Sequence, residues 1–308
     1  MSNLLFLQRQ LEKAGAELGS LNRALAENPG SRSLVAMTES MTSARSSLEQ
    51  AYLEEADALG VDVCSYRIFG DEAPTLSALT SILGTFQTLF SVIYGSVKDG
   101  TPKSRARVSP DTQADTLFRF GYSYPGSVGM VLTLPNDRML IGDSKLDESI
   151  RVAFEMAQAE TPEEVGTFAR TYGPASVRAM YKWAHAHSAV GLGAEIGWRR
   201  ATYIRNSLVL QAPELDRLAK AIELTGEVTE VDERLSGMLV AIDSDRRTFR
   251  VSFEGADEIH GRLADALALD EPARVPARYR VSLTKQTTVR YAMDDDQVTW
   301  QLNRLDLA

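Results

Sequence analysis

Two stretches of the chain combine basic residues with groups that suit phosphate or nucleobase binding. The first is the Gly-, Pro- and Ser-containing segment 98–107, and the second is segment 198–206, which also contains Trp198 and Tyr203. Guanidinium and ammonium groups bind phosphate, and aromatic rings stack on bases. The candidate binding residues are Lys103, Arg105, Arg107, Arg199, Arg200 and Arg205. The alternatives are a solvated loop for the first stretch, and for the second an edge strand or a helix with a solvated basic side.

Histidine and cysteine give little support for a metal centre. His185 and His187 are two residues apart, and the third histidine, His260, is distant. On a strand such a pair could bind one ion, but on a helix its side chains point about 200° apart. We expect a helix here and therefore no metal and no cofactor. The chain has one cysteine, which excludes an internal disulfide framework and suits a reducing compartment. This residue, Cys64, lies in the strand-like run 61–69 and is expected to be buried.

No motif of nucleophilic or phosphate-transfer chemistry is present. The Gly-rich run 191–197 lacks both the dinucleotide-binding spacing and the ending of a P-loop. Ser127 lacks the context of a nucleophile elbow. The acids Asp143, Asp147 and Glu148 are expected on the solvated face of a helix. No catalytic residue is assigned, although an enzyme with an unrecognised site stays an alternative.

Composition restricts the binding partners. A net charge of −9 and a pI near 5 argue against general binding to duplex nucleic acid or to anionic membranes, although a local basic patch remains compatible. The apolar run at residues 4–7 is too short for a signal peptide, and no run reaches the length of a membrane span. We expect a cytoplasmic protein that makes no membrane contact.

The N-terminal 60 residues are predicted to form a helical hairpin. Leucines recur at spacings of three, four and seven over residues 4–27, a second helical pattern covers 33–59, and Asn28-Pro29-Gly30 separates them. The stripe of the first helix is the candidate protein interface and includes Leu4, Leu7, Leu11 and Leu18. Sequence alone leaves open whether this stripe packs on its own chain or on a neighbouring subunit.

Residues 115–134 are predicted to form a β-hairpin that turns at Pro125-Gly126. Alternation places four aromatic residues on one face and an apolar row on the other, so both faces need a cover. A two-residue loop would pair Tyr122 with Gly129 and Phe120 with Val131, and a longer loop remains open. The nearly uncharged helical segment 76–97 is the expected cover for one face.

Helices are expected from about 143 to 188 and from 212 to 224, and short strands after 227. The expected strands are 235–242, 247–253, 258–263, 277–283, 287–292 and 297–302. The predicted fold is α+β: a domain at 1–225 with a helical hairpin and helices around an antiparallel sheet, then a small β-barrel at 226–308. The barrel is expected to be SH3-like or OB-like, two types that this pattern does not separate.

The leading functional hypothesis is a non-catalytic interaction or assembly protein, a homo-oligomer or a subunit beside another protein, that uses the helical hairpin and the barrel. The alternative is recognition of nucleic acid or a nucleotide through the six basic residues. A role in a bacterial defence or stress complex is compatible with either, but no residue indicates one.

Overall fold

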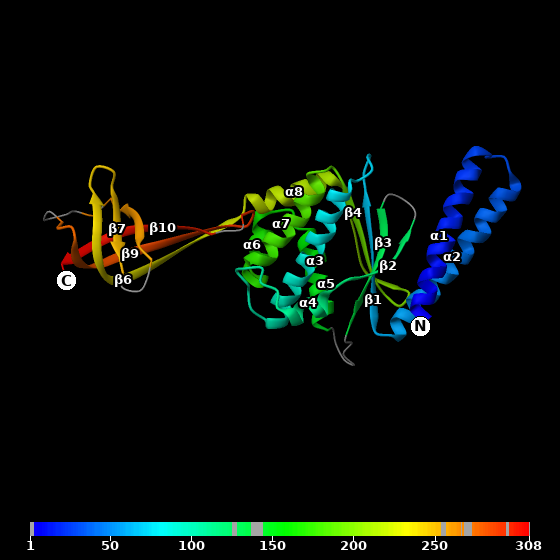
Figure 1. Cartoon of the computed structure of the whole chain (residues 1–308), viewed down its shortest axis with the longest axis horizontal. Helices are drawn as coiled ribbons and strands as arrows, with labels where there is room; N and C mark the ends of the chain where they lie inside the picture. The colour runs from blue at the N-terminus through cyan, green and yellow to red at the C-terminus, as the bar shows by residue number, and fades with distance from the viewer. Residues whose placement is uncertain are drawn as a thin grey trace. The chain divides into compact units, whose positions relative to one another are not determined.

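A computed structural model describes residues 3–124, 128–136, 144–253, 257–265, 267, 273–293 and 296–307. The chain forms two compact units, Met1–Leu224 and Thr225–Ala308. Over the described residues there are eight helices and two sheets, which confirms the α+β class (Figure 1).

The helical hairpin is present as α1 (Asn3–Glu27) and α2 (Arg32–Ala58). Ser31 caps α2, because its side chain accepts a hydrogen bond from the backbone N–H of Leu34. Near the chain's N-terminus the two helices pack on the sheet, where Leu7, Leu11 and Tyr52 are buried together. Farther along both helices most side chains are exposed or half-buried.

The first unit is built on an antiparallel sheet in the order β2-β3-β1-β4-β5. Its central strand β1 pairs with β3 on one side and with β4 on the other. The strands are β1 (Val61–Phe69), β2 (Arg119–Tyr124), β3 (Val128–Pro135), β4 (Gly193–Arg200) and β5 (Tyr203–Leu210). Both faces of this sheet are covered, since α1 and α2 lie on one side and α3, α7 and α8 on the other (Figure 1).

The remaining helices are α3 (Leu76–Asp99), α4 (Pro110–Thr116), α5 (Lys145–Ala157), α6 (Pro162–Tyr172), α7 (Pro174–Ser188) and α8 (Ala212–Glu223). As expected, α3 covers the sheet: the rings of Phe86 and Phe90 lie 5.3 and 5.1 Å from that of Phe118. By length and composition alone α3 could cross a membrane, a test that core helices of folded proteins also pass. In this structure eleven of its residues are buried.

The β-hairpin differs from its predicted form. Residues 110–116 are helical, and Tyr124 rather than Tyr122 lies opposite Gly129, so the longer loop is the one formed; residues 125–127 lie outside the described ranges. A bulge interrupts the pairing between Phe120 and Ser123. Consequently the aromatic row does not share one face. Phe118 packs on α3, Tyr122 packs edge-on against Tyr52 of α2, and Phe120 is exposed.

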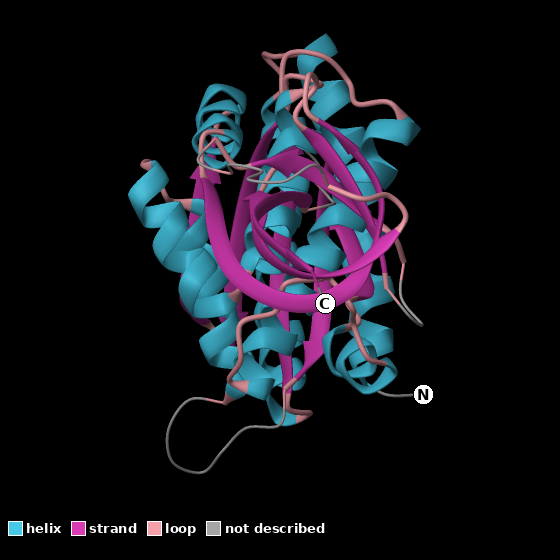
Figure 2. Cartoon of the chain, turned by 90° about the vertical axis from the view of Figure 1, so that its left-hand side faces the viewer, coloured by secondary structure: helices cyan, strands magenta, loops and turns pink. Residues whose placement is uncertain are grey.

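The second unit is a mixed five-stranded sheet whose pairings run β10-β8-β7-β6-β9, with β9 also paired to β10. Its strands are β6 (Gly226–Asp243), β7 (Thr248–Ser252), β8 (Ile259–Leu263), β9 (Ala277–Arg290) and β10 (Gln297–Leu307). The two strands expected at 277–283 and 287–292 are therefore one. Figure 2 shows the strong curvature of the strands near the C-terminus. Their core includes Leu239, Val251, Val281, Leu283 and Leu302.

Candidate functional site

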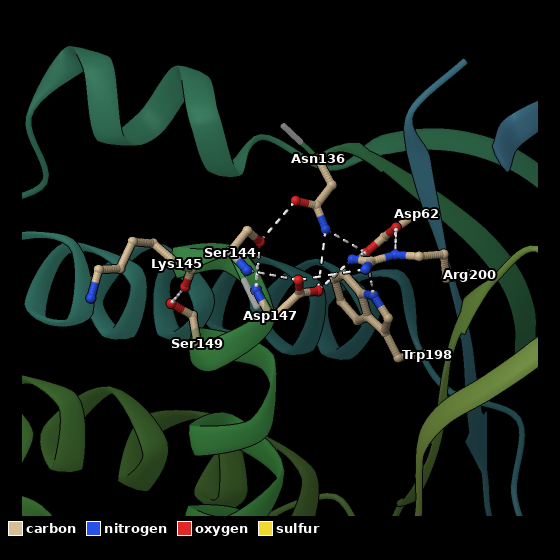
Figure 3. A network of polar contacts seen from close by, with 8 residues as sticks. All are labelled: Asp62, Asn136, Ser144, Lys145, Asp147, Ser149, Trp198 and Arg200. Atoms are coloured by element: carbon tan, nitrogen blue, oxygen red, sulfur yellow. Dashed lines mark hydrogen bonds and ion pairs between the residues drawn. The ribbon is translucent and has the colours of Figure 1, made fainter. Parts of the chain in front are cut away.

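A buried polar network gathers at the end of the sheet where β1 begins and β4 ends (Figure 3). Alternation along β1 places Asp62, Cys64 and Tyr66 on the face that the helices α3 and α7 cover. Asp62 is 1% exposed, and its carboxylate accepts hydrogen bonds from the indole of Trp198 at 3.1 Å and from the guanidinium of Arg200 at 3.0 and 3.1 Å. Both donors come from β4, the strand next to β1.

The helix α5 completes the network. Ser144 and Asp147 form a capping box at its N-terminus, which satisfies backbone N–H groups that the helix leaves unpaired. The Asp147 carboxylate also accepts a short hydrogen bond from Arg200. Asn136, just after β3, donates to Asp62 at 2.9 Å and accepts from the Ser144 hydroxyl at 3.0 Å. The network therefore ties three strands to one helix.

Its electrostatics suit a structural role better than proton transfer. Burial alone would favour the neutral form of Asp147, but hydrogen bonds from the Ser144 backbone and from Arg200 outweigh it and hold the pKa of Asp147 below its ordinary value. The hydrogen bond to Asp62, with a second to Asp147, raises the pKa of Arg200. A carboxylate held ionised against an arginine is a poor general acid or base near neutral pH.

A hollow of about 330 Å³ adjoins the network and shares Asn136 and Ser144 with it. Two charged residues on its wall are already in ion pairs: Asp115 with Lys98 at 2.7 Å, and Lys145 with Glu148 at 3.2 Å. Within the described ranges no group of three or more His, Cys, Asp or Glu residues could hold a metal ion. Asp143, one of the acids considered from the sequence, lies outside those ranges.

The first predicted basic segment packs on the beginning of α7. The Lys103 ammonium pairs with Asp99 at 2.7 Å, and the backbone carbonyl of Lys103 accepts a hydrogen bond from the N–H of Ala175 at 3.0 Å. Arg105 and Arg107 are exposed. Lys103 thus has a structural partner, whereas the other two side chains face solvent.

The second basic segment forms the β4–β5 turn. Arg200 is committed to the two carboxylates of the network, which leaves it a weaker phosphate ligand than the sequence suggests. Arg199 is half-buried and Arg205 is exposed, next to Tyr203 (76% exposed) and Ile204 (59% exposed). The two predicted basic segments therefore interact with different elements: Lys103 of the first contacts α3 and α7, and Arg200 of the second contacts β1 and α5.

The two histidines lie on a helix, α7, as expected. His187 is buried and its Nε2 lies 2.8 Å from the Tyr66 hydroxyl, which also accepts a hydrogen bond from the Trp183 indole at 2.8 Å. Because an indole N–H only donates, the Tyr66 hydroxyl can donate its own proton to His187. Burial lowers the pKa of His187 to about 4, so this histidine is neutral at physiological pH.

The leucine stripe of α1 is occupied within the chain. Leu7, Leu11 and Leu18 are buried, and Leu4 packs on the cluster formed with β1, β2 and β3. These side chains therefore already have partners within the chain, which is one of the two arrangements that the sequence left open. The large apolar residues that the helical hairpin does expose are Leu5, Phe6, Val35 and Met37.

The network itself was missed from the sequence. Asp62 offers a faint signal, since alternation places this charged residue on the same buried face of β1 as Cys64, Tyr66 and Ile68. Its partners lie 74 to 138 residues away in the chain, where no local pattern connects them.

The sequence matches no protein-family model, and comparison with curated proteins and with solved structures gives no match either.

Proposed function

We propose that this protein is a non-catalytic, cytoplasmic interaction or assembly protein that is oligomeric and works through its helical hairpin and its C-terminal sheet. We further propose that the C-terminal sheet is a small barrel of the SH3-like or OB-like type. The cyclic order of its strand pairings is compatible with such a barrel.

The observation that carries the proposal is the apolar surface of the helical hairpin. Phe6 on α1 and Met37 on α2 are each 55% exposed, and Leu5 and Val35 are each 38% exposed. Only the part of the hairpin near the N-terminus contributes to the core, so the rest of both helices is open to a partner. These side chains form two pairs, one near the start of α1 and one near the start of α2, and large exposed apolar side chains are found at protein-binding surfaces.

The buried ionisable groups support the same proposal. Asp62, Asp147 and Arg200 satisfy one another, and His187 is bonded to Tyr66. These groups hold the fold together, and none of them lines the hollow of about 330 Å³ beside the network. Their arrangement favours binding over chemistry.

Light scattering after size-exclusion chromatography at about 10 µM tests the proposal. We expect a mass above the 33.8 kDa of one chain, and a lower mass for the double variant Phe6→Ser/Met37→Ser. Glu39→Ser, an exposed polar change on α2, is the control and keeps the native mass. A native protein that elutes with the mass of one chain would contradict oligomerisation.

A second candidate is recognition of nucleic acid or a nucleotide at the β4–β5 turn. What favours it is the exposed Tyr203 ring beside the exposed Arg205. Fluorescence anisotropy with single-stranded oligonucleotides would show binding that weakens steeply with salt and is lost in the variant Arg199→Ser/Arg205→Ser. Binding that ignores salt, or no binding at low salt, would exclude this candidate.

A further inference from the structure

The strand β5 is a terminal strand of the first sheet. Over the described residues it pairs with β4 alone, so no other described strand occupies its second edge. Edge strands present unpaired backbone N–H and C=O groups, which act as a template for strand addition. Three large apolar side chains of β5 are also exposed: Tyr203, Ile204 and Val209 at 76%, 59% and 54%.

A hollow of about 540 Å³ lies beside the second half of β5. Residues 207–210 of β5 line it together with the end of α5 and the first turns of α8. A second hollow of about 480 Å³ adjoins it, because Gln158 and Ala159 line both. The edge and the hollows form one continuous surface.

Charge is distributed unevenly along this surface. Near the C-terminal end of β5 the hollows are lined by five glutamates and one arginine, among the described residues: Glu155, Glu160, Glu163, Glu164, Glu214 and Arg217. The opposite end of β5 carries Arg205 and follows Arg199 of β4. The surface is therefore basic near the start of β5 and rich in glutamate near its end, where Glu155 pairs with Arg151 at 2.8 Å and Glu214 lies 3.8 Å from Arg217.

An antiparallel neighbour with the same distribution of charge would be complementary at both ends. We propose that β5 pairs antiparallel with β5 of a second copy of this chain, about a twofold axis. This rests on the proposed assembly function and names its partner and one of its surfaces. The result is a continuous ten-stranded sheet, in which Arg205 of each copy lies beside Glu160 and Glu214 of the other.

The pairing of β5 with β4 contains a bulge, and this bulge limits the register in which two copies of β5 can pair. The regular pairing with β4 covers residues 206–210, and the shift between Trp198 and Arg199 leaves Arg205 outside the ladder. Opposite residues of an antiparallel pair point to the same face, so the axis passes at a residue rather than between two. Leu208 at the axis lets all five regular residues pair: Ser207 lies opposite Val209, and Arg205 lies just past Leu210 of the other copy.

The first test is the mass of the full chain between about 5 and 100 µM. We expect at least twice the single-chain mass for the native protein and for Glu39→Ser, and a lower mass than native for Val209→Lys, which places a charge on the pairing edge. Circular dichroism checks that this exposed substitution leaves the fold intact. If Val209→Lys keeps the native mass while Phe6→Ser/Met37→Ser loses it, the β5 pairing is wrong and assembly through the helical hairpin stands.

Charge reversal supplies a second readout. Arg205→Glu and Glu160→Arg should each weaken dimerisation about tenfold or more, and the two together should restore most of it. Absence of restoration in the double variant would overturn the proposed pairing of charges.

Cross-linking tests the register independently of affinity. Because Cys64 is buried, Ser207→Cys/Val209→Cys under mild oxidation should give a disulfide-linked product of twice the mass, and Glu39→Cys should not. If the cross-linked product forms although the native protein has the mass of one chain at 10 µM, the β5 pair is supported and a stable oligomer is contradicted. Its absence at 100 µM would overturn the pair.

Discussion

Arg200 carries one positive charge between two carboxylates that are almost entirely removed from solvent. The Asp62 side chain is 1% exposed and that of Asp147 is 6% exposed. Removing the guanidinium would leave two carboxylates facing each other across the same space with no counter-charge. Charges of this kind are costly to bury, and loss of one partner costs more than the intact pair gains.

We therefore expect Arg200→Met to lower the free energy of unfolding by about 3 kcal/mol. Asp147→Asn keeps the pair of Arg200 with Asp62 and should cost less, about 1–2 kcal/mol. Arg217→Met is the control, because Arg217 is 74% exposed and lies 3.8 Å from Glu214; it should stay within about 0.5 kcal/mol of the native protein. Urea unfolding followed by circular dichroism measures all three, and an equal effect of the two arginine changes would contradict the structural role.

His187 gives the stability a pH dependence of definite sign. Its pKa falls from 6.5 to about 4 on folding, so the native state binds fewer protons than the unfolded state between these values. This contribution to stability is complete above pH 6.5 and is lost as the pH falls towards 4. Between pH 7.5 and pH 5 it amounts to about 2 kcal/mol. Urea unfolding should show His187→Gln losing less stability over this range than the native protein does, and equal losses would contradict the assignment.

At the scale of elements, the junction of α6 and α7 depends on a glycine. Gly173 has φ of +90°, and a Cβ added there would overlap the backbone of Lys103 in the neighbouring loop. This close approach is what lets the loop accept the hydrogen bond from Ala175. An L side chain has neither the space nor the backbone conformation for this position.

Gly173→Ala should therefore lower the free energy of unfolding by about 1–3 kcal/mol. Gly84→Ala is the matched substitution, since Gly84 is an exposed position in α3 where an added Cβ meets nothing within 4 Å. It should raise stability by about 0.5–1 kcal/mol, because alanine is the better helix former. Thermal melts should therefore show that Gly173→Ala lowers the melting temperature and that Gly84→Ala raises it. Destabilisation by both substitutions would contradict this account.

The sequence predicted correctly those elements in which the spacing of apolar residues is uninterrupted. The leucine spacing of α1 and the apolar run of α3 predicted both helices, because a repeated face needs no knowledge of distant residues. The β-hairpin faces could not be predicted, because one bulge between Phe120 and Ser123 redirects every later side chain. Two strands were expected at 277–283 and 287–292, yet the residues between them, 284–286, lie inside β9, where they pair with both β6 and β10.

At the scale of the whole chain, the sequence predicted the α+β class, but not the polar network. The network joins β1, β3, β4 and α5, and its members come together only when the strand order is known. Net charge and composition were equally silent about the acidic surface at the end of β5, because it arises where the end of α5 and the start of α8 meet one strand. Features made by distant segments have no local signature.

Cys64 gives the protein a built-in reporter of its own opening. The chain has a single thiol, and it is buried in β1 with a paired strand on each side. Burial raises the pKa of this thiol and so suppresses the reactive thiolate. An alkylating reagent can therefore modify the native chain only when the middle of the sheet separates. The rate at which the chain gains the mass of the reagent measures how fast this opening occurs, and no label has to be introduced.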